Sequence, residues 1–109
     1  RGPSTMTCNN AATCNAVGAS PMGTTALAGH RNVASIVSDA TGKITISYKP
    51  AVVPAGANAL MIEPVNAANA ALNLSAAASA GSQISWACGT GPTAASTTLA
   101  AKYRPASCR

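Results

Sequence analysis

Four cysteines carry most of the chemistry that this sequence offers, and they stand in two close pairs. Cys8 and Cys14 lie near the start of the 109-residue chain, whereas Cys88 and Cys108 lie near its end. An even number of cysteines in a short chain is typical of disulfides formed in an oxidising compartment. Three pairings are open to four cysteines, and closeness in sequence favours Cys8 with Cys14 and Cys88 with Cys108.

A zinc site is the alternative use of these thiols. Structural zinc sites usually draw on closely spaced Cys and His ligands. The sequence has no Cys-x-x-Cys pair, and its only histidine, His30, stands far from every cysteine in sequence. We therefore favour disulfides, and we expect neither a metal site nor a cofactor.

The disulfides matter because the core must be small. Alanine accounts for 26 residues and Phe is absent, so the apolar side chains can bury little area. In the chain-entropy model, joining Cys88 to Cys108 stabilises the fold by about 3.3 kcal/mol, and joining Cys8 to Cys14 by about 2.4 kcal/mol. The chain is expected to depend on this covalent support.

Acid–base chemistry has few candidate residues. The only acids are Asp39 and Glu63, and nothing in the sequence brings them within the few ångströms that a hydrolytic carboxylate pair needs. A nucleophilic triad would have to use His30, which we interpret as a solvated loop residue beside Arg31. No phosphate-binding glycine loop and no nucleophile elbow occurs. The sequence therefore predicts a protein that is not an enzyme.

The net charge of +5 allows another function. No acid follows Glu63, and the basic residues gather only at the end of the chain, in Lys102, Arg104 and Arg109. Such a cluster is compatible with DNA or another anionic surface. Three aromatic residues make a poor platform for stacking bases, so DNA remains the lesser interpretation, with these three residues as candidate contacts.

Strands must position these residues. Two β-branched runs, 32–38 and 43–48, flank the turn 39–42 and predict a hairpin. In the second run Ile44, Ile46 and Tyr48 alternate with polar residues, which is the pattern of a half-buried strand. Further strands are expected over 59–63, ended by Pro64 because proline cannot donate to a ladder, and over 83–88.

The predicted core is formed by apolar side chains of these strands. Trp86 is the largest of them and is expected to pack beside the Cys88 disulfide. The full set is Val33, Ile36, Ile44, Ile46, Leu60, Ile62, Ile84 and Trp86. A sheet with one apolar face needs another element to cover that face.

Two segments are less regular. Residues 66–80 are rich in alanine, which favours helix, but Leu72 and Leu74 alternate with polar residues, and we favour strand or loop. Residues 1–29 predict surface loop, with at most a last helical turn near Cys8, because Asn9 and Asn10 suit the left-handed conformation that ends helices. No linker divides the chain, so we expect one domain over residues 1–109.

The end of the chain also resembles a known family. The strand ending Ser85-Trp86-Ala87-Cys88 and the terminal run from Ala101 to Cys108 are similar to the C-terminal disulfide region of type IVa pilins. The shared features are a Trp two residues before the first cysteine, an aromatic residue and a Pro before the second, and their place at the chain end. The resemblance covers the last quarter closely and weakens upstream.

The resemblance implies an α+β pilin-like fold. A roughly four-stranded antiparallel sheet would pack on a long N-terminal helix and carry a C-terminal disulfide-bounded loop. The sequence contains no apolar run of membrane-spanning length and no signal-peptide pattern. We therefore expect this chain to be the secreted ectodomain of a pilin whose N-terminal helix is truncated, so that contact with the membrane would be through that helix alone.

By the same resemblance, the protein would be a structural subunit of a type IV pilus. It would assemble with identical or related pilins, reside in the inner membrane before assembly and at the cell surface afterwards, carry N-terminal methylation, and support adhesion and twitching motility. The loop would staple the chain, pack in the filament, or contact host-cell or abiotic surfaces. The residues of this adhesion loop are Cys88, Gly89, Thr90, Lys102, Tyr103, Arg104, Pro105, Ala106, Ser107 and Cys108.

Two other functions stay open. A DNA-uptake minor pilin would use Lys102, Arg104 and Arg109 on a basic face near the loop. A secreted disulfide-rich binding module unrelated to pili would fit if the C-terminal resemblance were convergent.

Overall fold

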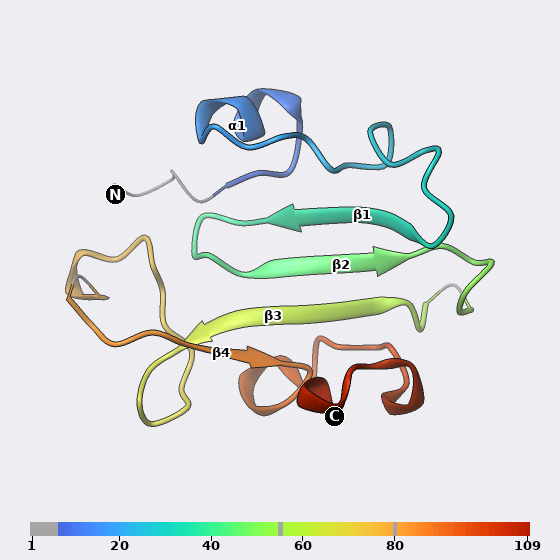
Figure 1. Cartoon of the computed structure of the whole chain (residues 1–109). Helices are drawn as coiled ribbons and strands as arrows, with labels where there is room; N and C mark the ends of the chain where they lie inside the picture. The colour runs from blue at the N-terminus through green and yellow to red at the C-terminus, as the bar shows by residue number, and fades with distance from the viewer. Residues whose placement is uncertain (1–6, 55, 80) are drawn as a thin grey trace.

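A computed structural model of the chain describes residues 7–54, 56–79 and 81–109. Its centre is an antiparallel sheet in the order β1-β2-β3-β4 (Figure 1). The strands are β1 (Val33–Ser38), β2 (Ile44–Tyr48), β3 (Ala59–Val65) and β4 (Ser85–Cys88). Met6, the start of the expected N-terminal turn, and Ala80, the end of the 66–80 segment, lie outside the described residues. The four predicted strands are confirmed, with shifted ends.

The β1–β2 hairpin turn is built around one carboxylate. Oδ1 of Asp39 accepts hydrogen bonds from the backbone N–H of Thr41 at 2.9 Å, the Thr41 hydroxyl at 2.6 Å and the N–H of Lys43 at 3.1 Å. Gly42 has a φ of 94°, which favours glycine, and a Cβ there would lie 2.7 Å from Cδ1 of Leu74. The predicted turn over 39–42 is confirmed.

Strand β3 passes through Pro64 to Val65, so the prediction that Pro64 ends it is wrong. The register of β2 with β3 stops at Ile62, so no β2 residue stands opposite Pro64 to require a donated hydrogen bond. The carbonyl of Pro64 accepts instead from the N–H of Leu72. Proline is tolerated here because the ladder has already ended on that side.

The core lies at one end of the sheet's apolar face. Directly opposed residues of antiparallel strands share a face, and the register aligns Ile46 with Leu60 and Ile62 with Cys88. The buried cluster is Val53, Leu60, Leu99 and Cys108, with Ile46, Tyr48 and Cys88 packed against it. We call the strand residues Ile46, Tyr48, Leu60 and Cys88 the covered half of this face.

The other end of the same face is less protected, and it contains the main error of the predicted core. Trp86 is 51% exposed and Ile84, which precedes β4, is 45% exposed. Of the eight residues expected in the core, Leu60 alone is fully buried, and Val33 and the remaining isoleucines are partly exposed. We call Ile36, Ile44, Ile62 and Trp86 the open half. Alternation correctly assigned these side chains to one face. At this end the described chain buries Pro64, which pairs with Trp86, but leaves Trp86 and Ile84 exposed.

The opposite face is not simply the solvated polar surface that was expected. Val65 and Ala87 are buried there, and Glu63 is only 8% exposed. The 3-10 helix η2 (Gly91–Thr93) contacts both β3 and β4. Loop packing therefore shields part of this face as well.

The outer edge of β1 is closed by the N-terminal segment, which lies above it in Figure 1. Cys8 and Ser38 exchange backbone hydrogen bonds at 3.0 Å, and the N–H of Ile36 donates to the carbonyl of Met22 at 2.8 Å. A hollow of about 190 Å³ remains beside Ile36 and Ile44. The N-terminal segment therefore reaches the margin of the open half without filling it.

Helix α1 (Ala11–Ala16) starts where a helix end was expected. Asn10 has extended dihedrals, φ −152° and ψ 174°, and its side chain accepts from the N–H of Thr13 while the Thr13 hydroxyl accepts from the N–H of Asn10. This reciprocal pair is an N-terminal capping box. Asn10 therefore begins a helix rather than ending one in a left-handed conformation.

The segment after β3 is loop, as favoured over helix. In its described part, residues 66–79, Ala71 forms a bridge with Val65 and one 3-10 turn occurs, η1 (Ala77–Ser79). Within the described ranges, none of the helices has the length and apolar character needed to cross a bilayer. The long helix on which a pilin sheet would pack, and which we expected to be truncated here, has no counterpart among the described residues.

Candidate functional site

The candidate site is the segment between the last two cysteines, which we call the C-terminal loop (residues 89–107). Cys88, at the end of β4, is bonded to Cys108, with 4.7 Å between their Cα atoms. The loop contains η2 and η3 (Ala101–Tyr103) and runs into η4 (Ala106–Cys108). The predicted Cys88–Cys108 pairing is confirmed.

The loop is fixed on the sheet by backbone contacts with the first half of β3. The N–H of Gly89 donates to the carbonyl of Met61, and the N–H of Leu99 donates to the carbonyl of Ala59. The hydroxyl of Thr97 accepts from the N–H of Met61 at 3.1 Å. The segment around Leu99 therefore occupies the place beside β3 that lies beyond the end of β4.

Two loop side chains are almost completely buried. Leu99 is 1% exposed and packs in the core cluster with Val53 and Leu60. Thr93 is fully buried, and its hydroxyl donates to the carbonyl of Thr90 at 2.7 Å. Sequence reasoning missed Leu99, although it is the only aliphatic residue larger than alanine between Cys88 and Cys108, and that isolation was the available signal.

Arg104 is turned into the loop rather than standing on the exposed basic face that a DNA contact would use. Its Nε donates to the carbonyl of Leu99 at 2.7 Å, and its Nη1 donates to the carbonyls of Gly89 at 3.2 Å and Cys108 at 3.4 Å. The guanidinium fork suits this role because its donors are held in a fixed plane. The half-buried Arg104 thus binds main-chain carbonyls from the beginning, middle and end of the loop.

Close packing around Arg104 explains the glycine after Cys88. Gly89 has a φ of 70°, in the left-handed region, and a Cβ there would overlap the carbonyl oxygen of Cys108. A side chain would therefore meet backbone that cannot swing away. Gly89, Cys88, Arg104 and Cys108 form the anchored part of the predicted adhesion loop.

The remaining residues of the predicted adhesion loop face solvent. Tyr103 is 49% exposed, and the Lys102 ammonium lies over its ring, 5.0 Å from the centroid. The other exposed members are Thr90, Pro105, Ala106 and Ser107. The loop therefore presents a small, uncharged surface apart from Lys102.

The three candidate DNA contacts are not equivalent. Lys102 is exposed and has the contact with Tyr103, whereas Arg104 is engaged with carbonyls. Nε of Arg109 also donates to the carbonyls of Ala101 and Arg104, each at 3.1 Å. Outside the loop Lys49 does the same, donating to the carbonyls of Ala28 and His30. Much of the positive charge of this chain therefore holds turns together.

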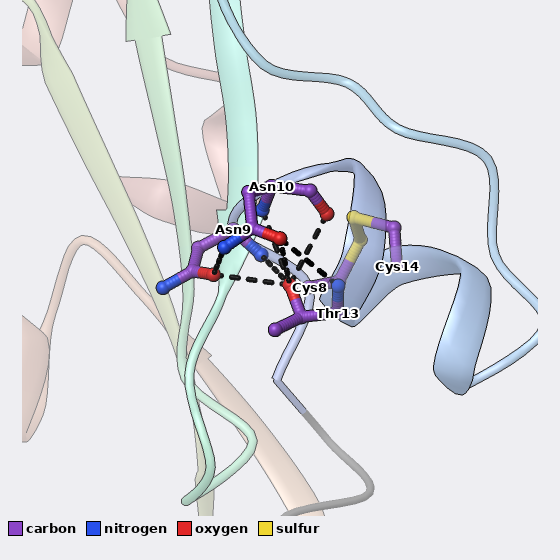
Figure 2. The surroundings of a disulfide bond; sticks show 5 residues. All are labelled: Cys8, Asn9, Asn10, Thr13 and Cys14. Atoms are coloured by element: carbon purple, nitrogen blue, oxygen red, sulfur yellow. Dashed lines mark hydrogen bonds between the residues drawn. A yellow bond between two sulfur atoms is a disulfide. The ribbon is translucent and has the colours of Figure 1, made fainter.

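The N-terminal disulfide sits in a more local setting. Cys8 is bonded to Cys14, which confirms the second predicted pairing. Figure 2 shows this bond beside the capping box, where the Thr13 hydroxyl bridges the side chains of Asn9 and Asn10. These contacts join residues no more than six apart, unlike those of the C-terminal loop.

Among the described residues, the remaining titratable groups do not form a reactive cluster. Nδ1 of His30 accepts from the N–H groups of Asn32 and Val33, at the start of β1. Nζ of Lys43 lies 3.9 Å from Oε2 of Glu63. Burial raises the pKa of Asp39, but the hydrogen bonds from Thr41 and Lys43 outweigh it and hold that pKa below its ordinary value.

The zinc alternative for the cysteines is overturned, because all four sulfurs are bonded in disulfides. Within the described ranges no other group of His, Cys, Asp and Glu could hold a metal ion.

An open cleft of about 530 Å³ lies between the start of α1 and the 21–26 segment, and its lining includes Asn9, Asn10, Thr24 and Thr25 without any charged residue.

Comparison with known proteins relates the chain to a protein family. A family model described as pilin, a bacterial filament protein, matches residues 3–109, which include all four strands and both disulfides. No curated protein and no solved structure matches the chain.

Proposed function

The chain belongs to the pilin family of bacterial filament proteins, and from that premise we propose that it is a pilus subunit whose C-terminal loop makes contacts outside the filament. Membership of the pilin family supports a structural role in an extracellular filament assembled from pilins. Pilins are structural proteins rather than enzymes. The observation that carries the proposal is the loop itself, whose ends and middle are fixed while Lys102 and Tyr103 remain exposed.

Adhesion to host-cell or abiotic surfaces is the contact that this arrangement supports best. A preformed loop loses little conformational entropy on binding, which favours affinity from a small surface. Tyrosine and lysine side chains can supply apolar area, a hydroxyl and a charge within that surface. We propose that Lys102 and Tyr103 make the principal side-chain contacts.

The test replaces exposed residues without touching the anchors. Bacteria that express Lys102→Ala together with Tyr103→Ala are expected to assemble normal numbers of pili but to adhere less to cells or plastic. Ser96→Ala, an exposed residue of the same loop away from η3, is the control. Unchanged adhesion with normal piliation would contradict the adhesion proposal, whereas absent pili would assign these residues to assembly.

We also propose that the open half is the surface on which an N-terminal helix of the mature subunit packs, as the resemblance to type IVa pilins implies. Ile36, Ile44 and Trp86 would supply the apolar contact. The same helix would hold the subunit in the inner membrane before assembly. Pili built this way would support twitching motility by their extension and retraction.

The single tryptophan reports on this packing directly. In a subunit that carries the helix, Trp86 fluorescence is expected to shift to shorter wavelength and to resist acrylamide quenching, compared with the 109-residue chain. Equal quenching in the two proteins would contradict this assignment. That result would leave the adhesion test unaffected.

DNA uptake is the second candidate function, supported by the absence of any acid after Glu63. If Lys102 and Arg109 each neutralised a phosphate, the affinity for duplex would fall with salt with a log–log slope near −1.8. Lys102→Gln with Arg109→Gln should then abolish binding. We expect only feeble, salt-sensitive association in the parent chain, because Arg104 is bonded inward; a band shift at physiological salt that the double variant loses would favour DNA uptake.

A further inference from the structure

The contacts of Arg104 run in parallel with the covalent bond between the last two cysteines. Its Nη1 donates to the carbonyl of Gly89, the residue next to Cys88, and to the carbonyl of Cys108 itself. The guanidinium therefore joins the main chain at nearly the same two points that the disulfide joins. None of these hydrogen bonds uses a sulfur atom, so each can form while both cysteines are thiols.

Arg104 also connects these two points to the sheet. Its Nε donates to the carbonyl of Leu99 at 2.7 Å. Leu99 is held by its own N–H on the carbonyl of Ala59 and by burial in the core. A chain with this residue in place would bring residue 108 back to β4 before any covalent link exists.

We propose that Arg104 is a positioning residue that brings Cys88 and Cys108 together for oxidation. The cysteines are 20 residues apart, and ordering so long a loop is entropically costly when nothing else holds its ends. The Arg104 contacts form only when the two ends of the loop are close. They therefore raise the equilibrium constant for disulfide formation, and the disulfide raises the equilibrium constant for these contacts by the same factor. This inference does not depend on what the loop binds in the filament.

The oxidation itself is ordinary thiol–disulfide exchange with a disulfide such as oxidised glutathione. The thiolate of one cysteine attacks the oxidant and releases one glutathione thiolate; the second cysteine thiolate then attacks the mixed disulfide and releases the other. Two protein thiols lose two protons and two electrons in total, and the oxidant is reduced to two thiols. Arg104 takes no part in the electron transfer and acts only on the distance between the two sulfurs.

The test is the equilibrium of the purified 109-residue chain with a glutathione buffer, in which each disulfide is quantified by alkylation and peptide mapping. Arg104→Gln is expected to lower the equilibrium constant for the Cys88–Cys108 bond about tenfold, since hydrogen bonds from a charged donor are lost. Arg104→Lys should lower it by a similar factor, because an ammonium cannot span the carbonyls as the planar fork does. Lys102→Gln removes an equal charge from an exposed position of the same loop and is expected to leave the constant within about twofold.

The Cys8–Cys14 bond in the same molecules is the internal reference. If Arg104→Gln left the equilibrium constant unchanged, Arg104 would have no effect on disulfide formation and the proposal would be overturned. If Arg104→Lys had the constant of the parent chain, the effect would be due to positive charge rather than to the guanidinium contacts, which would also overturn it. An equal fall at both disulfides would also overturn it, since that pattern reports general unfolding.

A second measurement examines the chain without the bond. In Cys88→Ser with Cys108→Ser, the amides of Gly89 and Leu99 are expected to stay protected from hydrogen exchange, and adding Arg104→Gln should expose them. Loss of protection while Arg104 is still present would contradict the proposal.

Discussion

The covered and open halves of the sheet carry the same kind of side chain and differ in what lies above them. In the covered half, Leu60 packs under Leu99 and Cys108, which arrive from the C-terminal loop. In the open half, Trp86 is half exposed, and a hollow remains beside Ile44. This difference shows that the alternation of residues in a strand decides on which face of the sheet a side chain lies. Whether that side chain is buried depends on which distant loop packs on that face.

The largest expected effect tests the covered half. Leu99→Ala removes the side chain that joins the loop to the core and should cost about 2–5 kcal/mol of unfolding free energy, as for other buried leucines. Urea denaturation followed by circular dichroism measures it. Ile44→Ala in the open half is the matched aliphatic truncation and should cost less than half as much; equal losses would remove the distinction between the halves.

The two disulfides give the next contrast, since Cys88 belongs to the covered half and Cys8 lines the hollow beside the open half. Replacing Cys88 and Cys108 by Ser should cost about 3 kcal/mol, because the bond closes the longer loop. Replacing Cys8 and Cys14 should cost less, about 2 kcal/mol in the same model. Thermal unfolding of the two double variants would refute this ranking if their midpoints were reversed.

Trp86 gives a smaller effect, and it reverses the expectation drawn from the sequence. Because Trp86 is 51% exposed, Trp86→Ala should change the unfolding free energy of the 109-residue chain by less than about 1 kcal/mol. Chemical denaturation monitored by far-ultraviolet circular dichroism is suitable, since the variant has no tryptophan. A loss of several kcal/mol would show that the open half is covered in solution.

The smallest effect concerns pH and the hairpin turn at the end of β1. The pKa of Asp39 is lowered in the folded chain, so its contribution to stability is complete above the unfolded value near 3.9 and is lost as pH falls through the folded pKa. Asp39→Asn keeps a carbonyl acceptor without the titration. The stability difference between parent and variant should therefore shrink below about pH 4; a difference that stays constant down to pH 2 would contradict the assigned role.

Several features of the fold could be predicted because they depend on residues close in sequence. The strand predicted from the alternation of Ile44, Ile46 and Tyr48 and the Asp39–Gly42 turn depend on local patterns, and both elements were confirmed. The burial of β2 does not alternate, since all five of its residues are partly exposed. The capping box of Asn10 and Thr13 is equally local. Asn10 was misinterpreted because Asn is also common where helices end. Thr13, at the third helical position, was the signal that distinguishes the start of a helix from its end.

The candidate site was predictable in outline and not in detail. Chain position and cysteine spacing identified the loop, and the disulfide pairing was correct. The direction of Arg104 was not, because a charged residue near a chain end is usually solvated, and its carbonyl partners extend to Gly89, 15 residues away. Thr97 escaped notice for the same reason, since its partner is the N–H of Met61 on another strand.

The sequence by itself determined the strands, the hairpin, the two disulfides and the resemblance to pilins, because propensity, turn chemistry and cysteine spacing act over short stretches of chain. Tertiary structure alone decided that Leu60 is sealed while Trp86 is not, that Pro64 fits inside a strand, and that Arg104 binds carbonyls instead of solvent. Each of these outcomes depends on a segment that returns from far along the chain. The free energy of such a contact belongs to the assembled loops and sheet, and no local pattern encodes it.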